Sequence, residues 1–326
     1  MKLFDTSSVN GVKHPFRVIV EKEISDHIRS WRFIILMAII LLTCFGALYT
    51  SLSNLGKVIK PTDPEDAFFF LRLFTASDGT LPSFLIFISF LGPLFGISLG
   101  FDAINTEHNH GTLSRVLAQP VHRDYVINAK FVAALTVISV MFFALGFLVV
   151  GLGLITIGIP PTAEEFLRIV IFILLSICYV AFWLNLAILF SVQFRQAATS
   201  ALACIAVWLF FSVFYNMIVV LVAKAIAPPE MASEYRIISF QRFILNLMRV
   251  APSQLFTDAS STLLMPNVRA LGPLTIEQVQ GTVPSPLPLG QSLLIVWSQL
   301  TALVAGTFVW FGLSYLSFMR KEIRSR

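Results

Sequence analysis

The chain has 326 residues, of which 56% are hydrophobic and only 13% are charged, and its formal net charge is +5. A water-soluble domain carries about 25% charged residues, so this chain has too few charges to cover a surface that faces water. The composition excludes a soluble globular domain, a disordered chain and a small disulfide-linked module, and it predicts an all-α protein that crosses a membrane several times.

The first predicted element is an amphipathic helix within residues 15–32. Its apolar side chains recur every three or four residues and lie within an arc about 120° wide; they are Phe16, Val20, Ile24, Ile28 and Trp31. Pro15 suits the first helical turn, where no backbone donor is needed. We expect this helix to lie on the inner surface of the membrane. Its candidate contact residues are Glu21, Glu23, Arg29 and Trp31.

Six uncharged segments follow, each long enough to cross a bilayer as a helix. None of them contains Asp, Glu, Lys, Arg or His, and they are residues 33–53, 81–101, 131–158, 169–191, 198–223 and 289–319. The predicted organisation is a transmembrane domain (33–319) between an N-terminal segment (1–32) and a short tail (320–326).

The positions of the basic residues predict the orientation of the spans. With both termini in the cytoplasm, most of the 23 Lys and Arg residues lie in the inner segments, as the positive-inside rule requires. The same rule explains the positive net charge without a nucleic-acid partner. We therefore expect a multi-pass protein of the cell membrane with cytoplasmic termini.

Between spans two and three, residues 102–124 predict a short helix exposed to the cytosol. Gly111 permits a tight turn and Pro120 stops the helix, while Asp124 is expected to cap the third span. Thr112 caps the short helix, and its apolar face is formed by Leu113, Val116 and Leu117. An apolar surface on a cytosolic loop indicates a docking site for another protein.

The sequence of this loop is similar to that of a known family. Glu107 is followed by Gly-Thr-Leu (111–113), by a Leu-x-x-Pro-Val-x-Arg stretch (117–123) and by Lys130. This order resembles the pattern of ABC-2 type transporter permeases, the membrane subunits of ABC exporters. The amphipathic helix, the six spans and the long segment before span six resemble the topology of that family.

The resemblance implies that the loop is a coupling helix inserted into a cleft of a separate ATPase subunit. The implied coupling residues are Glu107, Gly111, Thr112, Leu113, Val116, Leu117, Pro120, Arg123, Gln193, Phe194 and Arg195. It also implies that the ATPase subunit binds ATP and Mg²⁺, that this chain holds no cofactor, and that a second permease copy completes a homodimer or a paralogous heterodimer.

The segment before span six, residues 224–288, is too apolar for a plain linker. Apolar side chains recur in it at helical spacing, at Phe240, Phe243, Ile244, Leu247 and Met248. We expect helices here that lie in the outer interface or dip back into the protein; a small extracellular lid is the alternative.

Within the spans, three glycines and two asparagines are notable. Gly92, Gly96 and Gly100 recur every four residues, which favours close packing of two membrane helices. Asn185 and Asn216 are the most polar side chains of the spans. Each is expected either to bond to a neighbouring helix or to line a translocation path. His108 and His110 have no partners with metal-site spacing, so no metal site is expected.

The chain contains no phosphate-binding G-x-x-x-x-G-K-[ST] motif, so any use of ATP requires a second polypeptide. The function that fits best is a non-catalytic permease subunit of an ABC exporter, with spans two and five lining the path of an amphipathic or apolar substrate. The alternatives are an ion-coupled secondary transporter, which would require ionisable groups within the spans, and a membrane scaffold.

Overall fold

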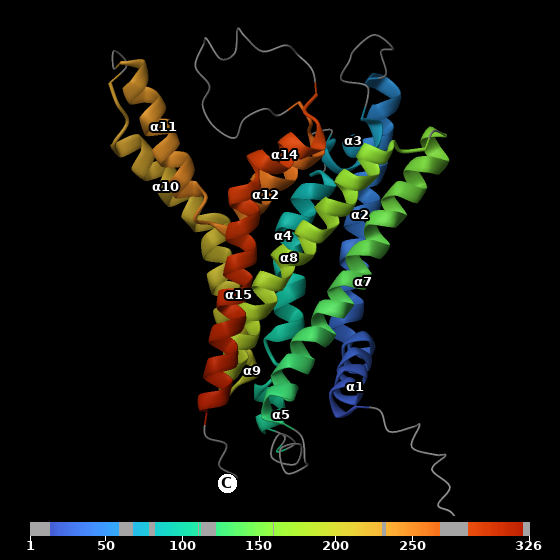
Figure 1. Ribbon diagram of the computed structural model, residues 1–326, viewed down its shortest axis with the longest axis vertical. Coiled ribbons are helices and arrows are strands. Elements are labelled where there is room, and N and C mark those ends of the chain that lie inside the picture. Colours follow the sequence, from blue (N-terminus) through green and yellow to red (C-terminus); the bar gives the residue numbers. More distant parts are fainter. Residues whose placement is uncertain are drawn as a thin grey trace, which may run out of the picture.

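The computed structural model describes residues 14–58, 68–77, 82–109, 111, 122–158, 160–229, 233–267 and 286–321. Within these ranges the chain forms helices and no strands, which confirms the all-α fold (Figure 1). The elements are α1 (Pro15–Arg29), α2 (Trp31–Val58), α3 (Phe69–Thr75), α4 (Phe84–Gly100), α5 (Asn105–Asn109), α7 (Arg123–Ile157), α8 (Ala163–Gln193), α9 (Ala197–Leu209), the π-helix η2 (Phe210–Phe214), α10 (Tyr215–Ala225), α11 (Glu234–Met248), α12 (Pro252–Leu264), α14 (Leu289–Ile295) and α15 (Trp297–Arg320).

Six helical stretches in the described ranges are long and apolar enough to cross a membrane, as expected. Five of them are longer than the predicted uncharged segments, because the helices continue through charged residues at their ends. The sixth is shorter than its predicted range of 289–319, since the span begins at Trp297 and residues 289–295 form the separate helix α14. Helix α7 begins at Arg123 and is capped by His122, so the expectation that Asp124 caps it is wrong. Asp124 lies in the first turn, where a negative charge interacts favourably with the helix dipole.

Helix α8 forms the centre of the bundle and contacts α4, α7, α12 and α15. In the most apolar 18-residue stretch of α8, 72% of the residues are buried, against 11% in the corresponding stretch of the fifth span (α9–η2–α10). The side chains of Tyr179 and Trp183 are completely buried in it. The fold is therefore built around the fourth span, while the fifth lies at the edge of the bundle (Figure 1).

The glycine stripe of α4 faces α8. A Cβ atom on Gly96 would lie 2.6 Å from the carbonyl oxygen of Val180, and one on Gly100 would lie 2.8 Å from that of Leu184. These distances are shorter than any van der Waals contact, so only glycine allows the two backbones to approach so closely. Small residues serve the same purpose in other membrane helix pairs.

At the upper end of the bundle in Figure 1, which carries α3, α11, α12 and α14, a buried arginine joins separate elements. Arg168 of α8 is paired with Glu164, 2.9 Å away. Its guanidinium also donates to the carbonyl oxygens of Leu263 (2.9 Å) and Leu287 (2.6 Å) and to the hydroxyl of Ser292 (3.2 Å). Arg168 therefore ties α12 and the start of α14 to α8.

The expected helices between spans five and six are α11 and α12. Helix α12 packs against α8, where the ring of Phe256 stacks on that of Tyr179 with centroids 4.4 Å apart. Helix α11 instead pairs with α10, and both diverge from the rest of the bundle (Figure 1). Residues 268–285 lie outside the described ranges.

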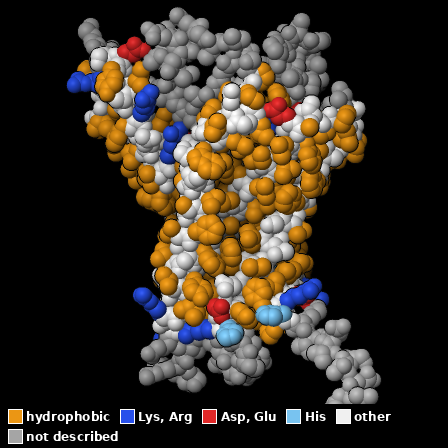
Figure 2. Space-filling model, in the orientation of Figure 1, with side chains coloured by type: hydrophobic (Ala, Val, Ile, Leu, Met, Phe, Trp, Pro, Cys, Tyr) orange, Lys and Arg blue, Asp and Glu red, His pale blue; other side chains and the backbone are white. Residues whose placement is uncertain are grey.

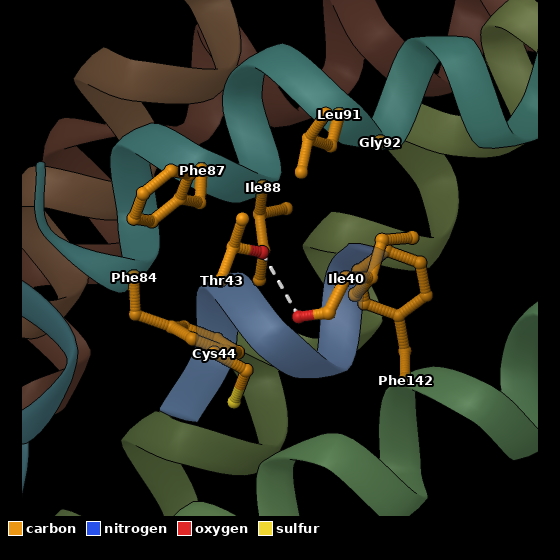
Figure 3. Close-up of a pocket in the computed structure, with 9 residues that line it drawn as sticks. All are labelled: Ile40, Thr43, Cys44, Phe84, Phe87, Ile88, Leu91, Gly92 and Phe142. Carbon is orange, nitrogen blue, oxygen red and sulfur yellow. Dashed lines mark hydrogen bonds between the residues drawn. The ribbon is translucent and has the colours of Figure 1, made fainter. Parts of the chain in front are cut away.

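The surface matches a membrane environment. In Figure 2, hydrophobic side chains cover the middle of the bundle, and the charged side chains in view lie toward its two ends. A narrow crevice between α2, α4 and α7 (Figure 3) has a volume of only about 10 Å³, room for about one water molecule. It is lined by Ile40, Thr43, Cys44, Phe84, Phe87, Ile88, Leu91, Gly92 and Phe142, and it is too small for a substrate.

Substitution of Gly96 by alanine tests the α4–α8 contact. Gly96→Ala should lower the free energy of unfolding by about 1–3 kcal/mol, because the added methyl group forces the helices apart. Thermal unfolding in detergent, followed by a thiol-reactive dye that labels the buried Cys44 and Cys204, measures the effect. Gly312→Ala is the matched control, since its Cβ meets no atom within 4 Å. Equal melting temperatures for the two variants would contradict the close packing.

Candidate functional site

The lower end of the bundle in Figure 1 carries α1, α5 and the last turn of α15, and it brings the predicted coupling elements together. The turn after α4 is held by α8, since the hydroxyl of Ser191 accepts hydrogen bonds from the backbone N–H groups of Ile104 (2.8 Å) and Asn105 (3.2 Å). The side chain of Asn109 donates to the carbonyl oxygen of Arg195 (2.9 Å). Residues 104–109 and the turn between α8 and α9 therefore form one surface.

Four charged side chains connect three helices at this surface. Nζ of Lys130 on α7 lies 2.8 Å from Glu107 on α5 and 3.0 Å from Glu23 on α1. Nζ of Lys22 lies 3.0 Å from Glu23 and 3.9 Å from Glu107. Lys130 and Glu23 are both buried, so each depends on the other for compensation of its charge. We call these four residues the ionic cluster.

The ionic cluster affects the protonation of α1. Burial opposes ionisation of Glu23, but Lys130 and Lys22 outweigh it and hold the pKa of Glu23 below its ordinary value of 4.5. Burial also disfavours the charged form of Lys22, yet Glu23, Asp26 and Glu107 raise its pKa above the ordinary value. The pKa of His27 is lowered from 6.5, mainly by burial. At neutral pH Glu23 and Lys22 are charged and His27 is neutral.

Two further arginines fix the edges of this surface. Arg32, at the start of α2, lies 2.7 Å from Asp102 and above the ring of Phe101. Arg123, expected from the resemblance to bind a carboxylate or a helix end, donates to the carbonyl oxygens of Phe318 (2.7 Å) and Lys321 at the end of α15. The surface thus includes the end of the sixth span.

The predicted coupling residues divide into three groups. Glu107 and Arg123 are bonded as described, and Gly111 has a φ of +66°, the left-handed conformation that glycine adopts readily. The residues of the turn after α8 are exposed; they are Gln193, Phe194 and Arg195. The remaining predicted residues lie outside the described ranges; they are Thr112, Leu113, Val116, Leu117 and Pro120.

Helix α1 docks on α7 through a face that contains only part of the expected apolar arc: Phe16 contacts Tyr125 of α7, and Ile24 packs against the core. Its packed positions include the buried Glu23 and the half-buried His27, while Ile28 and Trp31 are exposed. A carboxylate occupies this interface because Lys130 neutralises it. Glu21 pairs with Arg17 on the outer side of the helix, and Arg29 is exposed there.

The two asparagines of the spans have different surroundings. Asn185 is fully buried, and its amide donates to the carbonyl oxygen of Thr307 on α15 (3.2 Å), so it joins two helices. Asn216, on α10, is exposed and lines a cleft beside α12.

Several partners in this surface were not expected, notably Lys22, Asp102 and Ser191. The sequence does contain a signal for the role of Lys130, which follows Val126 and Ile127 at the spacing of one helical face. A charge on an apolar stripe requires a buried partner. The identity of that partner depends on the docking of α1, which no local pattern gives.

Among the described residues, no group of three or more His, Cys, Asp or Glu side chains could hold a metal ion. A family model described as ABC-2 family transporter protein matches residues 17–323, almost the whole chain. No curated protein matches the sequence. The family match covers α1, all six spans and the surface described above.

Removing the buried lysine should release α1. Lys130→Met leaves two carboxylates without their shared cation and should weaken docking by about 3–5 kcal/mol. Hydrogen–deuterium exchange of residues 15–29 measures the loss of protection. Arg17→Met is the matched control, because its ion pair is exposed and contributes less than about 1 kcal/mol. Equal exchange in both variants would contradict the role of the ionic cluster.

The docking of α1 should depend on pH in two steps. Because the docked state keeps His27 neutral, docking should weaken as the pH falls below 6.5, the ordinary pKa of histidine. The contribution of Glu23 is complete above 4.5 and is lost as the pH falls through its lower pKa in the folded protein. Exchange of residues 15–29, corrected for intrinsic rates, should show both steps, and His27→Gln should remove the first. A first step that persists in His27→Gln would contradict the assignment.

Proposed function

We propose that this chain, which belongs to the ABC-2 family of transporter proteins, is the membrane-spanning permease subunit of an ABC exporter. It is a membrane transport component, and in this proposal a separate ATPase subunit binds ATP and Mg²⁺ and supplies the energy. The observation that carries the proposal is the ionic cluster, because it links the coupling loop to two other helices.

In the proposed mechanism, closure of the ATPase subunits displaces the loop of residues 102–124. Glu107 lies in this loop, and its ion pair with Lys130 passes the displacement to α7, while Glu23 passes it from Lys130 to α1. The bonds of Ser191 and Asn109 pass the displacement to α8 and the turn before α9. One displacement thereby reaches spans three, four and five together.

The proposed transporter contains two copies of this chain or a paralogous pair. Little of the fifth and sixth spans is buried in the single chain. In the most apolar 18-residue stretch of each, 11% and 17% of the residues are buried. Exposed apolar side chains such as Leu202, Met217 and Phe308 supply a surface for a second copy or for lipid. Basic residues at the lower end support cytoplasmic termini in the cell membrane.

The proposed substrate is amphipathic or apolar, and its path runs along spans two and five. Two features support this path. The fifth span exposes an apolar surface, and at the same time it carries the exposed amide of Asn216.

Leu117→Asp tests the coupling role. An aspartate at this position should bury an unpaired charge in the docking cleft and weaken association with the ATPase by several kcal/mol, about 3 kcal/mol or more. The measurement is co-purification of this chain with a co-expressed candidate ABC ATPase that binds the wild-type chain. Leu117→Met, which keeps an apolar side chain, is the control and should co-purify normally. Normal recovery of the ATPase with Leu117→Asp would refute the proposed coupling helix.

A further inference from the structure

A cleft of about 190 Å³ lies between α4, the η2–α10 segment and the N-terminal half of α12. Most of its lining side chains carry a hydroxyl or an amide group; these are Ser89, Ser212, Tyr215, Asn216, Ser253, Gln254 and Thr257. Phe211 and Met248 add an apolar part to its wall. The cleft is therefore polar and apolar in similar measure.

The π-helix η2 forms one wall of this cleft. Its wide turn closes with the N–H of Tyr215 bonded to the carbonyl oxygen of Phe210. Phe211, Ser212, Tyr215 and Asn216, which line the cleft, all belong to this turn or follow it directly. π-turns inside longer helices are frequent at functional sites.

The cleft carries no formal charge of its own. The nearest charged groups, Arg249 and Asp258, are paired with each other at 3.0 Å. Gln254 donates to the second oxygen of Asp258 (2.7 Å). The lining groups that a ligand would meet are therefore uncharged hydroxyls and amides. The carboxylate of Asp258 next to them is already bonded through both oxygens, so a charged ligand would have to compete with Arg249 and Gln254 for it.

An exposed amide within a membrane span requires a polar partner. Asn216 lies within the span Ala197–Ala225, where contact between its amide and hydrocarbon is costly. Unlike Asn185, it faces the cleft and not a neighbouring helix. Its amide is therefore available to a polar group in the cleft, either water or a ligand.

We propose that this cleft binds the uncharged, hydroxyl-bearing head of an amphipathic molecule. Asn216 and Gln254 bind the head by hydrogen bonds from opposite walls, and Phe211 and Met248 contact the start of its hydrocarbon chain. The inference rests on the proposed function, since the cleft lies beside spans two and five of the proposed path. To the proposed function the inference adds the chemical class of the substrate and a role for α12 in substrate specificity.

The two walls of the cleft are held differently. Helix α12 is fixed to α8 by Arg168, which binds the carbonyl oxygen of Leu263, and by the stacked rings of Phe256 and Tyr179. The opposite wall, α10, pairs with α11 through the bond from the Tyr215 hydroxyl to the carbonyl oxygen of Leu247 (2.7 Å). A ligand of this cleft therefore bridges a fixed wall and one that diverges from the bundle.

Photolabelling of the full chain in phosphatidylcholine nanodiscs tests the proposal. The probe is dodecyl glucoside with a diazirine in its alkyl chain, and labelled peptides are identified by mass spectrometry. Labelling should map to peptides from η2–α10 and α12. Asn216→Leu and Gln254→Leu should each reduce it about fivefold, the effect of losing one hydrogen bond. Thr301→Val, an exposed substitution on α15, should leave labelling unchanged.

A trimethylammonium probe with the same alkyl chain provides the test of charge and should label these peptides at least about fivefold less. Asn216→Ser, which keeps a hydrogen-bonding group, should retain more labelling than Asn216→Leu if each variant unfolds at the wild-type temperature. Equal labelling by both probes, undiminished labelling of both leucine variants, or labels confined to other helices would overturn the proposal. The assay needs no ATPase, so its failure is distinguishable from failure of the Leu117→Asp test.

Discussion

The structure depends on one constraint: a charge placed inside an apolar helix bundle must find a partner within the protein. In the described part of the chain the buried cations are Lys130, near one end of the bundle, and Arg168, near the other. Lys130 is compensated by carboxylates from two other helices, and Arg168 by Glu164 and by backbone oxygens of the segment between spans five and six. Each buried cation thereby joins the helices that pack at its end of the bundle.

Lys130 and Arg168 are compensated by different kinds of group, and the physical consequences differ. Carboxylates at the lower end belong to separate helices and are shared by Lys130 and Lys22, so separation of α1 or α5 from α7 would leave a buried charge uncompensated. The carbonyl oxygens around Arg168 are fixed in the backbone, and several must be lost together if α12 leaves α8. Side-chain ion pairs therefore join the helices at one end of the bundle, and bonds from one side chain to several backbone oxygens join them at the other.

The sequence predicts most of the fold, because an uncharged run of about twenty residues has few alternatives to a membrane-spanning helix. The family resemblance implies a coupling role for Glu107, but its partner Lys130 is known only from the packing of α5 beside α7. Asn185 and Asn216 are equivalent as sequence, and only the neighbouring helices distinguish a structural amide from one that faces a cleft. The apolar arc of α1 locates its packed face in part, through Phe16 and Ile24, but misses Glu23, which joins that face by pairing with a distant lysine.

The π-turn in the fifth span has a mechanical consequence. It holds about one residue more than an α-helical turn, so its conversion to α-geometry would rotate everything after it by about 100° and lengthen the helix by about 1.5 Å. Asn216 follows this turn directly and would swing away from Gln254, while the backbone would remain hydrogen-bonded throughout. Rewinding of this one turn would thereby release the ligand that we propose for the cleft, while the other helices of the bundle stay packed.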